Sequence, residues 1–468
     1  MRKLVFAGVV ATWIGCGGAP PAPRPQGPVV AARPAGVAPA KPRVAGAPAT
    51  PAGDQLAWIL DVIGARHGAL PRAELEAHFD PSFLAQVPAD QALASFAELG
   101  AQLGELVLGE VEGDAGQLVA RVSAGATRLQ IVLALDPQHR RIATLVVRAE
   151  GDAGAKPRSF DEALRTVAAL APRAQLLVAG LDKAGCHPLQ ELAATDELAI
   201  GSTVKLYVLL ALADRIAAGK AAWSDEVVIR DEWKSLPSGT TQNEPPGKRL
   251  PLTTLAERMI SISDNTAADH LLYTLGRRTV EAAVRASGHA RPGLDAPFLS
   301  TRELFVLKLG TPAAELDRYL ALPEAKRRAY LDHRLADAYP NLSTAPDWTA
   351  ARRIDQLEWF ASSQDLCRTM AALWTRAQDP KAGPLLDVLS NNPGLPLDKA
   401  IWPYIGYKGG SEPGVFNMTF LLRRDDARWF VVTAGFNAAE GGKLEDAKIV
   451  TAMTGLIELL GAMGKPGG

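Results

Sequence analysis

Cysteine is scarce in this sequence, and its scarcity excludes several kinds of structure. The 468 residues include only three cysteines, Cys16, Cys186 and Cys367. With Cys16 near the N-terminus set aside, the other two cannot form the disulfide framework of a small secreted scaffold, although one disulfide or two buried thiols are both compatible with the sequence. The seven histidines are scattered, and no Cys/His spacing resembles a zinc site. We therefore predict no metal site and no cofactor.

An excess of either charge is also missing. The 50 basic and 51 acidic residues nearly cancel, so the composition gives no case for nucleic-acid binding or for a polybasic membrane-binding patch. Outside the N-terminus no run of about 18 or more apolar residues occurs, so we expect no internal transmembrane helix. The hydrophobic fraction of 47% is typical of a protein with a large core, and the length predicts two or three separate regions.

The first 16 residues have the composition of an export signal. A charged start is followed by an apolar stretch over residues 4–14, which is too short to span a membrane comfortably. The small residue before Cys16 resembles a bacterial lipoprotein cleavage site, in which the cysteine is acylated, although Trp13 departs from that pattern. The alternative is an ordinary secretory signal. Either interpretation predicts export to the periplasm or cell envelope, and the first adds a lipid anchor at Cys16.

Two regions of different composition follow the signal. Residues 17–53 are almost entirely Ala, Pro, Gly, Val and Arg, a composition that cannot bury a core and that we interpret as an extended tether. Residues 54–150 show helical apolar spacing and then four strands separated by turn residues, which predicts a small α+β domain without catalytic residues. Its histidines, His67, His78 and His139, are interpreted as ordinary surface or half-buried side chains.

Residues 158–468 form the larger predicted domain, after a junction at residues 151–157. Strands are expected over residues 175–180, 198–200, 402–408, 415–424 and 429–435, and helices over residues 159–170, 255–275 and 446–460. Because strands occur both before and after a long helical region, one sheet must be assembled from distant parts of the chain. We therefore predict an α/β three-layer sandwich with an antiparallel sheet.

Ser202 and Lys205 are the candidate catalytic pair. Their i, i+3 spacing at the start of an apolar helical run places both side chains on one face, roughly 5–6 Å apart at Cβ. A serine hydroxyl needs an adjacent base of this kind to act as a nucleophile. A lysine buried in such a helix is costly unless it has polar partners or a lowered pKa. The alternative is a serine that caps the helix and a lysine at the surface.

Two further motifs follow along the chain. The segment 263–265 (Ser-Asp-Asn) lies in or beside the helical stretch, and the segment 407–411 (Tyr-Lys-Gly-Gly-Ser) ends an expected strand. Ser-x-x-Lys, Ser-Asp-Asn and a Lys-Thr-Gly-like motif in this order resemble the class A β-lactamases and penicillin-binding proteins. The two-domain organisation, with the segments 300–305 and 358–362, is similar to the β-lactamase-like proteins of clavulanate gene clusters.

The resemblance implies a role for each matching residue. Ser202 attacks an amide or ester carbonyl and forms an acyl-enzyme, with Lys205 in its neutral form as the base. Ser263 relays the proton to the leaving nitrogen. Asn265 orients both Lys205 and the amide side chain of the substrate, and cationic Lys408 binds the substrate carboxylate.

The resemblance also implies an oxyanion hole, formed by the backbone N–H groups of Ser202 and Ser411. Gly409 and Gly410 belong to the substrate-binding strand beside it. Gly409 departs from the family pattern because the usual threonine hydroxyl, which contacts the substrate carboxylate, is missing. Ser411 is the side chain that we expect to replace it.

A second departure concerns hydrolysis of the acyl-enzyme. In class A enzymes the deacylating water is activated by a glutamate in a Glu-x-x-Leu-Asn pattern, which does not occur between the second and third motifs of this sequence. We therefore predict weak or unusual turnover. Residues 310–355 are interpreted as an insertion that is helical and charged around residues 324–334.

Three acidic residues between the second and third motifs have structural explanations. Glu303 is expected to close a capping box with Ser300 at the start of a helix. Glu358 and Asp355 are expected to form ion pairs with the arginines at positions 352 and 353. None of the three is assigned as the deacylation base.

The sequence thus favours an exported, lipid-anchored and monomeric serine hydrolase of the class A β-lactamase type. Its substrate would be a small β-lactam, whose breakdown confers antibiotic resistance, or a peptidoglycan-like molecule. The nearest alternative is a penicillin-binding, D,D-peptidase-like enzyme, which shares the acylation chemistry. A third hypothesis is a lipoprotein that binds a cell-wall ligand in the same cleft without hydrolysing it.

Overall fold

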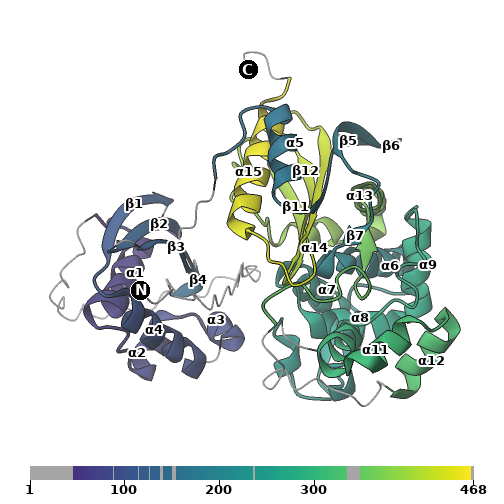
Figure 1. Ribbon diagram of the computed structural model, residues 1–468, viewed down its shortest axis with the longest axis horizontal. Coiled ribbons are helices and arrows are strands. Elements are labelled where there is room, and N and C mark those ends of the chain that lie inside the picture. The colour runs from purple at the N-terminus through teal and green to yellow at the C-terminus, as the bar shows by residue number, and fades with distance from the viewer. Residues whose placement is uncertain are drawn as a thin grey trace, which may run out of the picture. The chain divides into compact units, whose positions relative to one another are not determined.

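The computed structural model describes residues 46–464 apart from 88, 114, 126, 137–140, 150–153, 236–237 and 335–347. The chain divides into two compact units after residue 151, at the start of the predicted junction (Figure 1). The predicted signal segment 1–16, its Cys16 and most of the predicted tether lie outside the described residues. Export and lipid attachment therefore stay predictions.

The N-terminal unit begins with helices. They are α1 (Pro51–Leu60), the π-helical turn η1 (Asp61–Ala65), α2 (Arg72–His78), α3 (Pro81–Gln86) and α4 (Ala89–Leu103). The predicted end of the tether at residue 53 is wrong by three residues, because α1 starts at Pro51. Thr50 caps this helix by accepting a hydrogen bond from the Gly53 N–H at 3.1 Å, and proline favours the first helical position.

An antiparallel sheet completes the N-terminal unit. Its strands are β1 (Val107–Gly113), β2 (Gln117–Ala124), β3 (Thr127–Leu135) and β4 (Ile142–Ala149) in the order β1-β2-β3-β4, which confirms the predicted meander. Alternate residues along β2 and β3 are buried and join Leu56, Ile59 and Phe79 of the helical segments in one core. The predicted small α+β domain is therefore confirmed.

The C-terminal unit is built on a five-stranded antiparallel sheet. Its strands are β5 (Arg173–Asp182), β6 (Gly185–Leu192), β11 (Tyr404–Glu412), β12 (Val415–Arg423) and β13 (Trp429–Asn437) in the order β11-β12-β13-β5-β6. Strand β6 was not predicted. The strand expected over residues 198–200 is the short β7 (Leu198–Ala199), which pairs with β10 (Phe360–Ala361) rather than with the main sheet.

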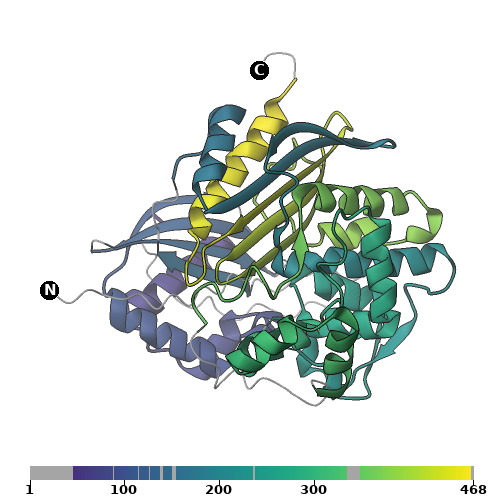
Figure 2. The same ribbon diagram turned by 45° about the vertical axis from the view of Figure 1, so that its right-hand side comes forward.

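Helices cover both faces of this sheet. On one face α5 (Phe160–Ala169) and α15 (Asp446–Ala462) pack side by side, and on the other face lie α6 (Lys205–Ala217), α13 (Ser363–Arg376) and the remaining helices of the C-terminal unit (Figures 1 and 2). Each face has its own hydrophobic core. The predicted three-layer α/β sandwich is therefore confirmed.

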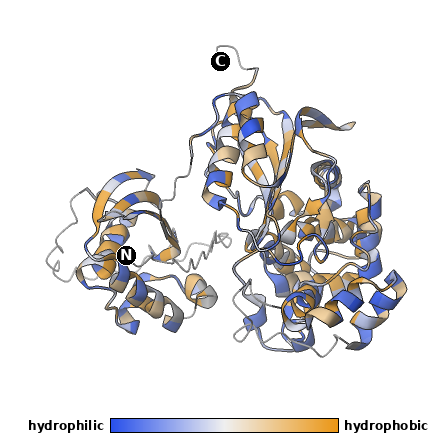
Figure 3. Ribbon diagram, viewed as in Figure 1, coloured by the Kyte–Doolittle hydropathy of each residue, from blue (hydrophilic) through white to orange (hydrophobic). Residues whose placement is uncertain are grey.

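The remaining elements form the helical region around α6. They are β8 (Glu226–Val228), η3 (Asp231–Trp233), η4 (Thr241–Asn243), β9 (Arg249–Pro251), α7 (Leu252–Ser261), α8 (Asn265–Leu275), α9 (Arg277–Ala286), α10 (Thr301–Phe305), η5 (Val306–Gly310), α11 (Ala313–Leu320), α12 (Glu324–Arg334), η6 (Pro380–Ala382) and α14 (Leu385–Ser390). Helix α12 confirms the predicted charged helix and is mostly hydrophilic in Figure 3. In the part of the chain that is described, none of the helices has the length and apolarity that a membrane span requires.

A disulfide connects the edge strand β6 to a helix on the sheet. It joins Cys186 of β6 to Cys367 of α13, with the Cα atoms 6.4 Å apart. Cys367 is fully buried. Of the two alternatives that the sequence left open, one disulfide or two buried thiols, the structure therefore contains the disulfide.

Replacing Cys186 with serine and Cys367 with alanine is expected to lower the free energy of unfolding by about 2–5 kcal/mol. The cross-link spans 181 positions and so restricts a large part of the unfolded chain. Chemical denaturation with and without a reductant measures the effect. The reductant should reproduce the loss in the wild type and leave the double variant unchanged, and equal stability of the two oxidised proteins would contradict this expectation.

Candidate active site

Ser202 lies in a short 3₁₀ turn, η2 (Gly201–Val204), that leads directly into α6. Gly201 has a φ of 49°, in the left-handed region that glycine adopts readily. Ser202 is half-buried, whereas Lys205 at the start of α6 is fully buried. The Lys205 Nζ lies 3.1 Å from the Ser202 Oγ. The predicted pairing is present, and the alternative of a surface lysine is excluded.

The second motif interrupts what was predicted as one helix over residues 255–275. The chain instead forms α7 and α8, with Ser263 and Asp264 between them. Ser263 has a φ of 56°, a conformation that costs on the order of 1–3 kcal/mol for a residue other than glycine. Asp264 caps α8 by accepting a hydrogen bond from the Ala267 N–H at 2.8 Å. The apolar spacing continues through both helices, which is why periodicity alone did not show the break.

Asp264 also holds the neighbouring loop against the motif. Its second carboxylate oxygen accepts hydrogen bonds from the N–H groups of Thr240 and Thr241, each at 2.8 Å. A Cβ on Gly239 would lie 2.2 Å from the Asp264 carboxylate carbon, so only glycine fits there. The strained backbone at Ser263 is thus fixed by the helix cap and by the packed loop.

Lys205 is surrounded by oxygen atoms of the second motif. In addition to the Ser202 Oγ, three oxygen atoms lie within hydrogen-bond distance of its Nζ: the Ser263 carbonyl at 2.6 Å, the Ser263 Oγ at 3.1 Å and the Asn265 Oδ1 at 2.7 Å. Burial lowers the pKa of Lys205 to about 7, although the negative charge of Asp264 opposes this shift. A large fraction of Lys205 is therefore neutral near pH 7 and able to accept a proton.

Lys408 reaches the same cluster from the edge strand β11. Its Nζ donates to the Ser263 Oγ at 3.1 Å and to the Gly409 carbonyl at 2.5 Å, and the side chain is 3% exposed. Burial lowers the pKa of Lys408 well below its ordinary value, and the positive charge of Lys205 lowers it further. The Ser263 hydroxyl thus lies between two lysines, within 3.1 Å of each.

The third motif also brings two backbone segments together. A Cβ on Gly410 would lie 1.9 Å from the Ile200 carbonyl and 2.7 Å from the Ser202 N, and a Cβ on Gly201 would lie 3.1 Å from the Ser411 N. Only glycine at position 410 therefore permits this close approach. The N–H groups of Ser202 and Ser411 are neighbours in space, as the predicted oxyanion hole requires.

The three acidic residues considered as a deacylation base all have ion-pair partners. Glu303 forms the predicted capping box with Ser300 and pairs with Arg277 at 2.6 Å. The expected pairing of Asp355 with Arg352 or Arg353 is wrong, since Asp355 pairs with Arg173 at 2.6 Å.

Glu358 also pairs differently from the expectation. Its partner is Lys308 at 2.7 Å rather than Arg352 or Arg353, and Arg353 pairs with Asp317. The cause is burial, because Glu358 and Lys308 are both sealed from solvent, whereas Arg353 stays partly exposed.

The buried pair belongs to a cluster that sequence reasoning missed. Lys308 of η5 also contacts Glu412 at 2.6 Å, one residue after Ser411 on β11. The Trp359 carbonyl, next to Glu358, accepts a hydrogen bond from the Ile200 N–H at 3.0 Å. One lysine and two carboxylates thus connect the end of β11 with the segment that precedes Ser202. A lysine in an otherwise apolar segment was the only sequence signal for this cluster.

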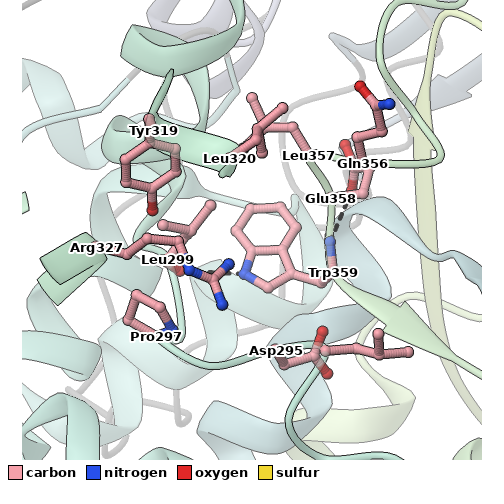
Figure 4. Close-up of a pocket in the computed structure, with 11 residues that line it drawn as sticks. Asp295, Pro297, Leu299, Tyr319, Leu320, Arg327, Gln356, Leu357, Glu358 and Trp359 are labelled. Atoms are coloured by element: carbon pink, nitrogen blue, oxygen red, sulfur yellow. Dashed lines mark hydrogen bonds between the residues drawn. The ribbon is translucent and has the colours of Figure 1, made fainter. Parts of the chain in front are cut away.

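A separate small cavity lies beside this cluster (Figure 4). Asp295, Arg327 and Trp359 are among its lining residues, and its volume of about 20 Å³ is enough for roughly one water molecule. The Asp295 Oδ2 and the Arg327 Nε lack hydrogen-bond partners among the described residues. None of the residues from the three motifs lines this cavity, so it is not the substrate cleft.

Of the histidines interpreted as ordinary side chains, His67 is exposed and His78 is half-buried. His78 stacks on Trp58 with the ring centroids 3.9 Å apart, and His139 lies outside the described residues. Within the described ranges no group of three or more His, Cys, Asp or Glu side chains could hold a metal ion. The predicted absence of a cofactor stays a prediction.

Several solved structures resemble this chain, and no curated protein matches it. A β-lactamase from Sphaerobacter thermophilus is 20% identical, with coverage of 66% of this chain and 98% of that chain and a TM-score of 0.44. A β-lactamase from Desulfarculus baarsii is 18% identical, with coverage of 66% and 100% and a TM-score of 0.45. PBP-A is 15% identical, with coverage of 65% and 97% and a TM-score of 0.43.

Two family models match separate parts of the chain. Residues 47–140 match the N-terminal region of the ORF 12 gene product, which corresponds to the N-terminal unit. Residues 162–457, more than half of the chain, match the β-lactamase enzyme family, and this range contains all three motifs that meet around Lys205. The chain therefore belongs to the β-lactamase enzyme family.

Proposed function

We propose that this protein is a serine hydrolase that opens β-lactams or related amides and esters through an acyl-enzyme on Ser202. The observation that carries the proposal is the position of Lys205, whose Nζ is buried, has a pKa lowered to about 7, and lies 3.1 Å from the Ser202 Oγ. A base with this geometry and pKa activates a serine hydroxyl at neutral pH.

The proposed reaction begins with proton transfer from the Ser202 hydroxyl to neutral Lys205. The Ser202 oxygen attacks the substrate carbonyl, and the N–H groups of Ser202 and Ser411 stabilise the developing oxyanion. Removing one such donor in other hydrolases costs about 10²–10³ in rate. The proton then passes from Lys205 to the Ser263 hydroxyl, 3.1 Å away, and Ser263 transfers its own proton to the leaving nitrogen.

The two lysines beside Ser263 favour an anionic substrate. Lys205 and Lys408 are both buried beside Ser263, and neither forms an ion pair in the described part of the chain. An anionic group near Lys408 would stabilise its protonated form, since an opposite charge raises the pKa of a lysine. We propose that Lys408 binds the substrate carboxylate and that Asn265 orients the amide side chain of the substrate.

We propose that turnover of the acyl-enzyme is slow. The acidic residues considered as a deacylation base, Glu303, Asp355 and Glu358, are all held in ion pairs. The same observation favours a second candidate function, that of a D,D-peptidase-like penicillin-binding enzyme acting on peptidoglycan stem peptides. Both candidates share the acylation step and differ in the fate of the acyl-enzyme.

One experiment separates these functions. The exported form and its Ser202→Ala variant are mixed with a chromogenic cephalosporin and with a fluorescent penicillin. Continuous colour release that requires Ser202 supports a β-lactamase, whereas one stoichiometric, Ser202-dependent fluorescent band supports the penicillin-binding alternative. The absence of both signals would overturn the proposal and favour a protein that binds a cell-wall ligand without acylation.

Acylation is expected to slow as the pH falls below about 7. Lys205 accepts a proton only in its neutral form, and burial lowers its pKa to about 7, so the neutral fraction falls about tenfold for each further pH unit. The second-order rate constant of penicillin acylation, measured between pH 5 and 8, reports this ionisation in the free protein. A rate that stays constant over this range would contradict the role of Lys205 as the base.

We also propose that the protein is exported, anchored through a lipid on Cys16, and related to the two-domain proteins of clavulanate gene clusters. The sequence of residues 1–16 supports the first two statements, and the separate family match of residues 47–140 supports a two-domain relationship. Cell fractionation of a Cys16→Ser variant tests the anchor. Membrane association equal to that of the wild type would count against it.

A further inference from the structure

Tyr407 occupies the space that a side chain at position 409 would need. The two residues are two positions apart on β11 and therefore lie on the same face of the strand. A Cβ added to Gly409 would lie 2.1 Å from the Tyr407 Oη and 2.8 Å from its Cζ. The Oη therefore lies within the space that the side chain of a serine or threonine at 409 would need. The phenol of Tyr407 thus fills the space beside position 409.

The surrounding residues hold the Tyr407 ring in this position. It packs against Phe420 of β12 with the ring centroids 4.7 Å apart. A Cβ on Gly394, which has a φ of 69°, would lie 2.5 Å from the same ring. Glycines at 394 and 409 thus both make room for the phenol, and the hydroxyl has a defined location rather than a range of rotamers.

The Tyr407 hydroxyl has no structural task that would explain this arrangement. None of the hydrogen bonds in the described part of the chain uses it, and it is not among the sealed polar atoms that lack partners. The side chain is half-buried, so the residue is not sealed inside the protein. Burial raises the pKa of Tyr407, which keeps the phenol protonated and therefore a hydrogen-bond donor at neutral pH.

The Tyr407 hydroxyl and the Lys408 amine belong to the same edge strand. Strand β11 is the edge of the five-stranded sheet, so a ligand that lies along its free edge meets side chains from both faces of the strand. Lys408, between Tyr407 and Gly409, faces Ser263 and Lys205 on one side. A carboxylate bound at this edge would receive the positive charge of Lys408 and a neutral donor from Tyr407.

We infer that the Tyr407 hydroxyl donates a hydrogen bond to the carboxylate of an acidic substrate and so determines specificity for acidic substrates. This inference rests on the proposed acylation of Ser202. It differs from the expectation that the Ser411 side chain replaces the missing threonine hydroxyl. Ser411 is exposed at the end of the strand, whereas the phenol lies within the side-chain space of residue 409 itself.

The test compares a penicillin with its methyl ester in the wild type and in a Tyr407→Phe variant. Phenylalanine keeps the ring and its packing and removes only the hydroxyl. We expect the ratio of the acylation rate constants, acid over ester, to fall about tenfold or more, because a hydrogen bond to a charged group is lost. A purely structural role would lower both constants together, and an unchanged ratio would overturn the inference.

A double variant tests the spatial exchange directly. Tyr407→Leu removes the phenol and should also lower the acid-to-ester ratio. Adding Gly409→Thr to Tyr407→Leu places a hydroxyl in the vacated space and should restore the ratio, whereas Gly409→Thr alone collides with Tyr407. Failure to restore the ratio in a folded double variant, checked by its thermal midpoint, would count against the inference. A wild type that is not acylated at all would overturn the proposed function, and this inference with it.

Discussion

Replacing Lys205 with methionine is expected to slow the acylation of Ser202 by about 10²–10⁴-fold. Methionine has a similar length and fills the same space but cannot accept a proton. The Ser202 hydroxyl would remain at the start of α6, without the amine that now lies 3.1 Å away. Stopped-flow or gel-based measurement of fluorescent penicillin labelling gives the rate constant.

An exposed lysine provides the matched control. Lys156 is about half exposed and pairs with Glu458 at 2.6 Å, so Lys156→Met should change stability by less than about 1 kcal/mol and should leave acylation unchanged. Thermal unfolding of the Lys205→Met protein separates loss of chemistry from loss of structure. Labelling of a folded Lys205→Met protein at a rate within threefold of the wild type would contradict the proposed base.

Lys308→Met is expected to lower the free energy of unfolding by about 3–5 kcal/mol. It removes the only ammonium that contacts the carboxylates of Glu358 and Glu412 in the described structure, at 2.7 and 2.6 Å. Burial alone would lower the pKa of Lys308, but the two carboxylates raise it. Without this charge the two carboxyl groups stay buried, and the negative charge that they carry together has no cationic partner. Urea denaturation measures the loss, and a change below about 1 kcal/mol would contradict it.

Glu412→Gln is the matched control for this cluster. Burial, followed by the negative charge of Glu358, raises the pKa of Glu412 well above its ordinary value, which favours a protonated side chain that glutamine resembles. We expect a loss of about 1 kcal/mol or less at neutral pH. Because the pKa of Glu412 is higher in the folded state, its contribution to the free energy of unfolding is fully present below the unfolded-state pKa. This contribution is lost as the pH rises through the folded-state pKa. The wild type should therefore lose stability relative to Glu412→Gln as the pH rises.

Local patterns predicted much of this fold. The strands β11, β12 and β13 and the helices α5 and α15 follow from apolar runs bounded by turn residues, and these runs are long enough to show their period. The contact between Ser202 and Lys205 follows from their i, i+3 spacing at a helix start. Each of these features depends on residues that are close together in the sequence.

Features that depend on distant residues were not predicted. The break at Ser263 is fixed by the hydrogen bonds of Asp264 to the loop at Thr240 and Thr241, which the apolar period of α7 and α8 does not report. The ion pair of Lys308 with Glu412 joins positions 104 residues apart. The pairing of Cys186 with Cys367 likewise depends on how β6 packs against α13. Folding brings these groups together, and their sequence neighbours do not indicate their partners.

The position of Tyr407 shows a different limit of sequence reasoning. Gly409 was interpreted as a lost hydroxyl, because a motif comparison considers each position separately. In the structure the phenol two residues earlier lies over the glycine. A hydroxyl is thus present beside position 409, although the residue at that position has none.

The proposed function requires that the Ser202 oxygen becomes covalently attached to the substrate. Intact-mass measurement of the protein after incubation with a penicillin, followed by peptide mapping, detects this attachment. We predict a single adduct with the full mass of the penicillin on the peptide that contains Ser202, and no adduct on the Ser202→Ala protein. An adduct on another residue, or an unmodified protein after prolonged incubation with no loss of the penicillin, would contradict the account.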